Sequence, residues 1–322
     1  MISANQVVSQ KINLDNQKVD RLLDYISEKY PMLYLAVQKN LQKNPELFYL
    51  VGNQLIDWAY NYLGDGYETV LGDSYHFFML DVLMTQNLYE KLGHYPNKDY
   101  QASYQNIYDN SEYMLKYHWG CYLISFLWEH HLKLYQYFQD SFLRHLSSKP
   151  SGKILELGSG SGIWLLLLLN QLSNWTAWGI DISKKTVEIA QKNAQVNGFG
   201  DQVKFMVGDA TRFEEQEKQE KFDGVISFDV IEHLEKPELL IKNMANNLNP
   251  GGYAFLGAAL TATESGHIYE FRRESEVVLL AEKNDFRVIS YWSLAPEDFP
   301  SKYRFLPRTQ ALFMQKRIND IW

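Results

Sequence analysis

Three acidic residues each follow a short apolar run, and their spacing suggests that they share one ligand. Glu156 lies two residues before Gly158 in "KILELGSGSGIW", Asp181 closes "WGID", and Asp209 follows "FMVG". If the three runs are parallel strands, their carboxyl ends meet at one edge of a sheet, where ligands of such sheets bind. The pattern therefore predicts a ligand site lined by three carboxylates.

The glycine-rich turn between Glu156 and the next helix narrows the choice of ligand. Gly158, Gly160 and Gly162 have the spacing GxGxG, whereas the dinucleotide fingerprint is GxGxxG. A tight strand-to-helix connection alone could explain three glycines. An acid at the end of the preceding strand opposes a pyrophosphate and suits a cationic ligand instead.

The other two acids suit a nucleoside. Asp181 lies about 20 residues beyond the glycine turn, where an acid can accept hydrogen bonds from ribose hydroxyls. A carboxylate at Asp209 can accept from an adenine amino group. Each acid also has a purely structural explanation: a solvated strand end for Glu156, a cap of the helix that starts at Ser183, and a turn residue for Asp209. Three acids at three consecutive strand ends favour the ligand.

The second half of the chain supplies the elements that would position these acids. Apolar runs alternate with helical stretches, which predicts a doubly wound, mostly parallel α/β sheet. The strand candidates are "KILEL", "TAWGIDI", "QVKFMV", "FDGVISF", "GGYAFLGAA", "FRVISYWSL" and "TQALFMQK".

The first half differs in its tyrosine content and in the spacing of its apolar residues. Of the 22 tyrosines, 18 precede residue 150, and apolar residues recur there at three- and four-residue intervals. This spacing predicts a mainly helical domain over residues 1–148, followed by the sheet domain over 149–322. The turn-rich segment "SSKPSG" at 147–152 separates the two.

Composition excludes several classes of function. The 322 residues carry a net charge of -8, which disfavours a nucleic-acid partner. The single cysteine, Cys121, allows no internal disulfide. The longest apolar run, "GIWLLLLL", is shorter than the ~20 residues that span a bilayer. The amino-terminal stretch lacks the pattern of a secretory signal, so we expect a cytoplasmic protein without a membrane partner.

Five segments in order resemble the class I S-adenosylmethionine-dependent methyltransferases: "ILELGSGSGIW", "WGIDIS", "VGDAT", "FDGVISFDVIEHL" and "LNPGGYAFL". The resemblance covers roughly residues 150–316, about half of the chain. It implies a Rossmann-like sheet of seven strands with the last antiparallel, and S-adenosyl-L-methionine as the cofactor. The preceding helical half is then expected to be a cap that closes over the cofactor.

The resemblance also implies roles for single residues. The glycine turn passes under the methionine part with Glu156 near its ammonium group, Asp181 holds the ribose, and Asp209 with Ala210 meets the adenine. The expected cofactor-binding set is Glu156, Gly158, Ser159, Gly160, Gly162, Asp181, Ile182, Asp209, Ala210, Phe228 and Trp119. Aromatic faces stabilise a sulfonium, and Tyr113, Tyr117 and Trp119 are the candidates for that contact.

His233, at the end of "FDVIEH", is the expected general base, with an orienting or capping histidine as the alternative; Tyr113 and Tyr117 complete the predicted catalytic set. We expect no metal. Glu232 and His233 alone are an incomplete ligand set, and the adjacent His130 and His131 point apart on a helix.

"FDVIEHL" stands where adenine-methylating enzymes usually carry Asn-Pro-Pro-Tyr, so a small-molecule acceptor is favoured for C-, O- or N-methylation. Two alternatives stay open. One is cyclisation of the cofactor on itself with release of methylthioadenosine, and the other is a non-catalytic cofactor-binding module. A homodimer is compatible with the sequence but is not indicated by any pattern in it.

Overall fold

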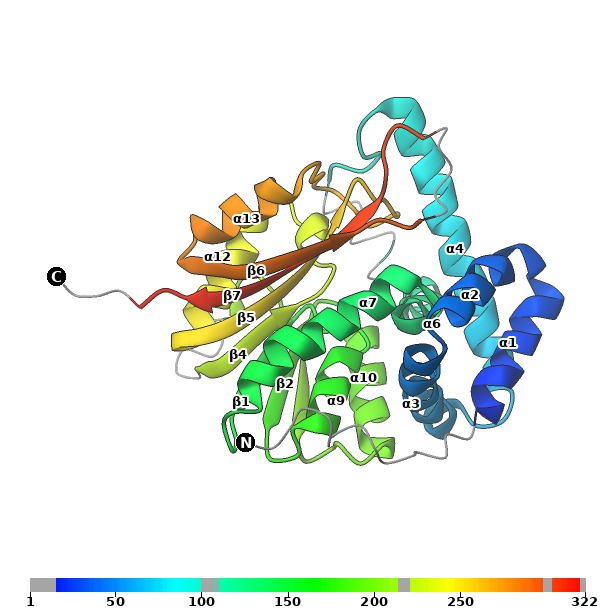
Figure 1. Ribbon diagram of the computed structural model, residues 1–322, viewed down its shortest axis with the longest axis horizontal. Helices are drawn as coiled ribbons and strands as arrows, with labels where there is room; N and C mark the ends of the chain where they lie inside the picture. The colour runs from blue at the N-terminus through cyan, green and yellow to red at the C-terminus, as the bar shows by residue number, and fades with distance from the viewer. Residues whose placement is uncertain (1–15, 100–106, 108–109, 214–220, 298–302, 319–322) are drawn as a thin grey trace.

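The computed structural model describes residues 16–99, 107, 110–213, 221–297 and 303–318 (Figure 1). A seven-stranded sheet has the order β3-β2-β1-β4-β5-β7-β6. Its strands are β1 Lys153–Leu157, β2 Thr176–Asp181, β3 Val203–Val207, β4 Phe222–Ser227, β5 Leu248–Leu260, β6 Phe286–Leu294 and β7 Arg308–Lys316. The first five run parallel, and β7 lies antiparallel between β5 and β6. The predicted α/β Rossmann-like fold is confirmed.

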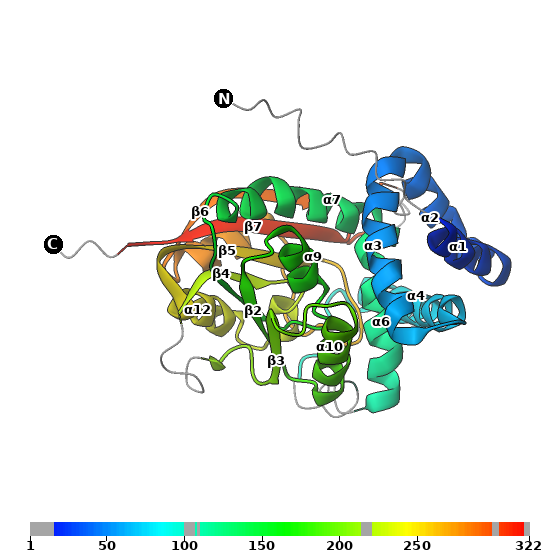
Figure 2. The same ribbon diagram turned by 90° about the horizontal axis from the view of Figure 1, so that it is seen from below.

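Helices cover both faces of this sheet (Figures 1 and 2). One face carries α7 (Glu129–Phe138), α9 (Ile163–Gln171) and α10 (Lys184–Val196). The other carries α12 (Pro237–Asn247) and α13 (Glu274–Glu282). Helix α9 is buried from Ile163 to Leu169 because it packs between the sheet and the helical half of the chain. The apolar run in "GIWLLLLL" is thus a core helix.

The first half of the chain is helical, as predicted. Its helices are α1 (Gln17–Lys29), α2 (Pro31–Lys43), α3 (Pro45–Leu63), α4 (Tyr67–Leu92) and α6 (Ser111–Leu127). Helices α4 and α6 cross closely at Gly120, where a Cβ would come within 2.5 Å of the Cβ of Phe78. A larger residue at Gly120 would therefore force these two helices apart.

The helices of the first half continue to Leu146, close to the boundary predicted at residue 148, but the last of them pack on the sheet. Helix α7 continues through a π-helical segment, η2 (Gln139–Leu143), into α8 (Arg144–Leu146), and this stretch packs on the sheet. Phe138 and Phe142 contact Phe255 of β5, with ring centroids 5.0 and 6.1 Å apart. The last part of the predicted helical domain, from Glu129 on, therefore packs with the sheet.

Helix α4 is tied to the loop that follows β5. The hydroxyl of Thr85 donates to the backbone oxygen of Thr263, and Asp81 accepts from the backbone N–H of Ser265 at 2.9 Å. Just beyond α4, the hydroxyl of Tyr95 donates to the backbone oxygen of Ala262 at 2.5 Å. These bonds fix the loop at 261–270 against the helical half.

Candidate cofactor and acceptor site

A cleft of about 620 Å³ lies between the carboxyl ends of the strands and the helical half. Residues of both halves line it. From the sheet half come Glu156, Gly158, Ser159, Gly160, Trp164, Asp181, Ile182, Asp209, Ala210, Phe228 and His233. From the helical half come Phe78, Met79, Val82, Met114, Tyr117, His118 and Cys121.

The glycine turn forms the floor of this cleft. The N–H groups of Gly158 and Ser159 both donate to the backbone oxygen of Ile180, at 2.7 and 2.8 Å. Gly160 has φ +48°, and a Cβ there would meet nothing within 4 Å, because the residue faces the open cleft. Gly162 instead caps α9, packs against Phe205, and is not among the cleft-lining residues of the described chain.

Asp181 bridges the glycine turn and the following helix. Its two carboxylate oxygens accept from the backbone N–H groups of Gly160 and Ser183, each at 2.9 Å. Burial raises the pKa of Asp181, and these two N–H groups counter part of that rise. Ser183 itself caps α10, so Asp181 is more than the helix cap considered above. Each oxygen keeps a lone pair for a ligand hydroxyl.

Glu156 is buried without full compensation. Only 1% of it is exposed, and its Oε2 has no hydrogen-bond partner among the described residues. Burial raises the pKa of Glu156 well above its usual range, and the charge of Asp181 adds to the rise. A buried carboxylate needs a compensating partner. A cationic group in the cleft would supply it.

Asp209 holds the turn after β3 in shape. Its Oδ1 accepts from the backbone N–H and the hydroxyl of Thr211, at 2.8 and 2.6 Å. The amide of Asn243 donates to the backbone oxygen of Ala210 at 2.6 Å. Ile182 lines the same part of the cleft. The predicted adenine residues therefore lie together.

Two stacked aromatic rings form one wall of the cleft. Phe228, just after β4, stacks on Trp164 of α9 with ring centroids 3.8 Å apart and planes 5° apart. The sequence argument named Phe228 but missed Trp164. Its position two residues beyond the last glycine could have suggested it, because the first turn of that helix faces the ligand.

Helix α6 brings only part of its aromatic segment to the cleft. Tyr117 and His118 line it. Trp119 is fully buried against Tyr62 and Tyr122 and lies outside the lining of the described cleft. We therefore no longer expect it to contact the cofactor. Tyr113 stacks behind Tyr117, with centroids 6.0 Å apart, and also lies outside that lining.

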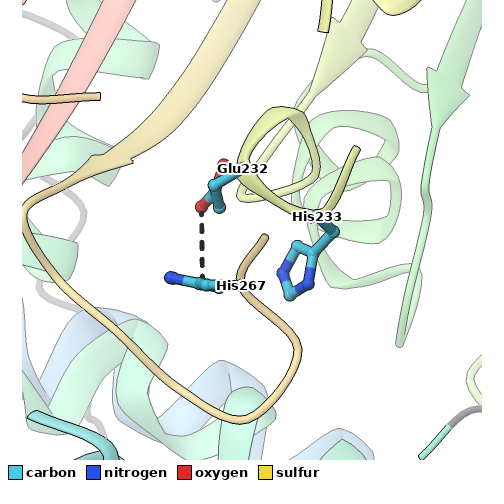
Figure 3. Close-up of side chains that lie close together, drawn as sticks. All are labelled: Glu232, His233 and His267. Atoms are coloured by element: carbon cyan, nitrogen blue, oxygen red, sulfur yellow. Dashed lines mark ion pairs between the residues drawn. The ribbon is translucent and has the colours of Figure 1, made fainter. Parts of the chain in front are cut away.

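A cluster of two histidines and two glutamates occupies the deep end of the cleft. Glu232 and His233 belong to a short 3-10 turn, η3 (Ile231–His233), and Glu264 and His267 belong to the loop after β5. Figure 3 shows the side chains of Glu232, His233 and His267 turned toward one another. The sequence predicts His233 for catalysis and places Glu232 beside it, but no pattern in it marks Glu264.

Burial dominates the electrostatics of this cluster. It raises the pKa of Glu264 to about 8 and that of Glu232 well above its usual range. It lowers the pKa of His233 to about 4 and that of His267 well below its usual range. Both imidazoles are therefore neutral at neutral pH, so each keeps one nitrogen lone pair for a proton or a cation.

The family described as methyltransferase domain matches residues 128–294, slightly more than half of the 322 residues. The chain belongs to this methyltransferase family. The match begins at Trp128, directly before α7, which packs with the sheet.

Curated relatives include enzymes named for ubiquinone biosynthesis. A ubiquinone biosynthesis O-methyltransferase of Rickettsia typhi is 28% identical over 139 residues, which are 43% of this chain and 53% of that protein. The mitochondrial enzyme of that name from Arabidopsis thaliana is 27% identical over 129 residues, 37% of this chain and 38% of that protein. The chain thus spans about half the length of the first of these relatives, or less for the second.

Solved structures with related folds show lower identity. The cyclase SpnF is 14% identical with a TM-score of 0.49, over 60% of this chain and 83% of its own. A methyltransferase of Geobacter sulfurreducens solved with S-adenosyl-L-homocysteine is 17% identical with a TM-score of 0.42, over 55% and 89% of the two chains. Within the described residues, no helix is both long and apolar enough to cross a membrane.

Proposed function

We propose that this protein transfers a methyl group from S-adenosyl-L-methionine to a hydroxyl oxygen of a small, largely apolar molecule. The observation that carries the proposal is the convergence of Glu156, Asp181 and Asp209 on one cleft whose far wall is the helical half. The family match and the names of the O-methyltransferase relatives support the same reaction.

The residues present fit the cofactor. The orphaned Oε2 of Glu156 suits an ammonium group, and Asp181 has lone pairs to spare for ribose hydroxyls. The open space at Gly160 leaves room for the ligand to pass close to the backbone. When bound, S-adenosyl-L-methionine supplies a methyl group activated by a positive sulfur, and the stacked Phe228 and Trp164 offer aromatic surface beside it.

The acceptor pocket fits an apolar molecule with one polar end. Phe78, Met79 and Val82 of α4 present apolar surface, and the Glu–His cluster faces them from the other half. The helical half excludes water and holds the acceptor oxygen in line with the methyl group, which is the main requirement of a displacement reaction. A neutral His233 can accept the acceptor's proton, as the sequence argument expected.

Product analysis tests the proposal. The purified chain is incubated with the cofactor and a panel of phenols and hydroquinones that carry apolar substituents, and the products are separated by mass. Adenosylhomocysteine together with a methylated acceptor supports it. Methylthioadenosine without an acceptor would indicate self-cyclisation, and unchanged cofactor that still binds would indicate a binding module. Either result would overturn the proposal.

A further inference from the structure

The Glu–His cluster at the deep end of the cleft has a feature that the proposed methyl transfer does not explain. Its members are the side chains of Glu232, His233, Glu264 and His267. They are almost fully buried, with side-chain exposures of 0%, 12%, 6% and 7%, respectively. Neither Oε2 of Glu232 nor Oε2 of Glu264 has a hydrogen-bond partner among the described residues.

The tautomer of His267 directs a ring-nitrogen lone pair toward both glutamates. Its Nδ1 lies 2.9 Å from the backbone oxygen of Ala262, which can only accept, so Nδ1 carries the hydrogen. The Nε2 of neutral His267 therefore presents a lone pair. That lone pair faces Oε1 of Glu232 and Oε1 of Glu264, each at 3.8 Å. The ring nitrogen and the two carboxylate oxygens therefore lie where they could share one proton or one cation.

The distances suit a single metal ion at the centre. The Nδ1 of His233 lies 3.6 Å from Oε1 of Glu264. Ligand atoms of Glu232, His233 and His267 all lie within 4.8 Å of one another. Ligands at about 2.1 Å from a tetrahedral ion are about 3.4 Å apart, so shifts of a few tenths of an ångström to about one ångström would bring these atoms into range.

The surroundings also resemble those of metal ligands in general. A ligating histidine usually donates its other ring N–H to a carbonyl or carboxylate, as His267 does to Ala262. Glu232 is held by the backbone N–H of Ala259 at 3.2 Å, and Glu264 by that of Gly266 at 3.1 Å. The loop that carries Glu264 and His267 is in turn tied to α4.

We propose that Glu232, His233, Glu264 and His267 bind one divalent transition-metal ion. Two imidazoles favour Zn²⁺, Fe²⁺ or Co²⁺ over Mg²⁺, which prefers an all-oxygen shell. The ion faces the acceptor cleft, so an acceptor oxygen can complete its coordination. This proposal departs from the expectation of no metal, which weighed Glu232 with His233 but did not include Glu264 and His267.

The role of the ion rests on the proposed function. A hydroxyl that binds a divalent ion loses its proton to solvent water more readily. The resulting oxygen anion attacks the methyl carbon, an oxygen–carbon bond forms, the carbon–sulfur bond breaks, and its electron pair stays on sulfur. With the ion bound, His233 holds the ion, and solvent water takes the proton in place of the histidine base of the proposed function.

Metal titration of the full chain tests the site without cofactor or acceptor. The protein is treated with a chelator, exchanged into metal-free buffer, and titrated with Zn²⁺ by calorimetry and with Co²⁺ by visible absorption. We expect one ion per chain and ligand-field bands from Co²⁺. His267→Gln and Glu264→Gln should each weaken Zn²⁺ binding at least ~10-fold. His145→Gln and Glu238→Gln, exposed and remote from the cluster, should bind as the wild type does.

The outcomes separate the metal site from the proposed function. The metal site would be overturned if the wild type took up no ion, or if the cluster variants bound Zn²⁺ like the wild type. A proton on Glu264 would then take the place of the ion in the cluster. If Gln variants fail to fold, Glu264→Asp and His267→Asn with their melting curves repeat the comparison. Cofactor binding is measured on the same samples. Ion binding without cofactor binding keeps the site and rejects the methyltransferase proposal.

Discussion

Asp181 has a structural role and a proposed binding role, which a matched pair of variants can separate. Asp181→Ala should weaken S-adenosyl-L-methionine binding by about tenfold to over a hundredfold, because hydrogen bonds to a charged acceptor contribute roughly 1.5–3 kcal/mol. Calorimetry on wild type and variant measures this change. Equal dissociation constants would remove Asp181 from the ribose site.

Asp223 supplies the control for that comparison. It accepts from the backbone N–H of Lys153 and from the side chain of Lys149, each at 3.0 Å, at the opposite end of the strands. Asp223→Ala therefore loses comparable structural bonds. It should lower stability but leave cofactor affinity unchanged, so a loss of affinity in both variants would point to general unfolding.

Glu156 is expected to lower the free energy of unfolding of the cofactor-free protein, and to lower it more at higher pH. Its folded-state pKa is raised, so the folded state loses stability as pH rises from the unfolded value of 4.5 toward the folded one. Glu156→Gln removes this titration. The variant and the wild type should melt at similar temperatures near pH 4.5, and the variant should be more stable by about 1 kcal/mol at pH 8. Melting curves at both pH values measure the difference.

The same variant should bind the cofactor less well, because a neutral amide does not pair with an ammonium group. Higher stability with weaker binding would show that Glu156 is kept for its ligand. If Glu156→Gln were less stable at pH 8, or bound the cofactor normally, the proposed ammonium contact would be wrong.

At the scale of the element, the role of the glycine turn in cofactor binding can be tested with alanine, which adds a single methyl group. Gly160 and Gly198 both have positive φ, +48° and +82°, and neither would place a Cβ within 4 Å of another atom. Alanine should cost about the same backbone strain at the two positions, of the order of 1 kcal/mol. Only Gly160 faces the cleft. Gly160→Ala should thus weaken cofactor binding measured by calorimetry, while Gly198→Ala should not.

The difference in cofactor affinity between these two variants decides the question, because backbone strain alone would affect both alike. Equal cofactor affinity in the two would mean that the turn is only a connection between β1 and α9.

Helix α6 is expected to act on the reaction more than on cofactor binding. Tyr117 lines the cleft, and its hydroxyl lowers the pKa of Glu264, which burial raises. Tyr117→Ala should lower kcat more than it lowers cofactor affinity, because the helical half positions the acceptor. Tyr117→Phe should keep most activity if the ring face matters and behave like alanine if the hydroxyl positions Glu264.

Steady-state kinetics with an acceptor that the wild type methylates gives kcat for both variants. Tyr49→Phe is the control, because Tyr49 bonds Asp20 at 2.8 Å within the helical half, away from the cleft. A cofactor dissociation constant that rises as much as kcat falls would place Tyr117 on the cofactor instead.

At the scale of the whole molecule, local patterns predicted the sheet well and the acceptor pocket poorly. Alternating apolar runs and helical stretches are set by neighbours in sequence, and each of the three acids lies at or just beyond the carboxyl end of its own strand. No strand end or motif marks Glu264 or His267 in this way. They meet Glu232 and His233 only because the loop after β5 is held against α4, and such a meeting depends on contacts far apart in the chain.

Trp119 shows the same limit of prediction from sequence, here for a residue that was expected at the cleft. Sequence places it one residue from His118 on a helix near the cleft, but a rotation of about 100° between neighbours sends its ring into the core against Tyr62 and Tyr122. Which face of α6 meets the sheet half is decided by packing, which the sequence pattern of an all-round apolar helix does not reveal.

The helical half and the sheet half should unfold together. One hydrophobic cluster runs from Val19 and Leu22 of α1 through Phe126 and Phe138 to Phe255 of β5. Separating the halves would expose this shared surface, at roughly 25 cal/mol per Å² of apolar area. Calorimetric heating should therefore give a single transition, with equal calorimetric and van't Hoff enthalpies. Cofactor should shift the whole transition upward, because the two halves unfold as one unit although its proposed contacts lie in the sheet half. Two separate transitions, with cofactor shifting only one, would show that the helical half is an independent accessory domain and that the acceptor pocket has been placed on the wrong side of the cleft.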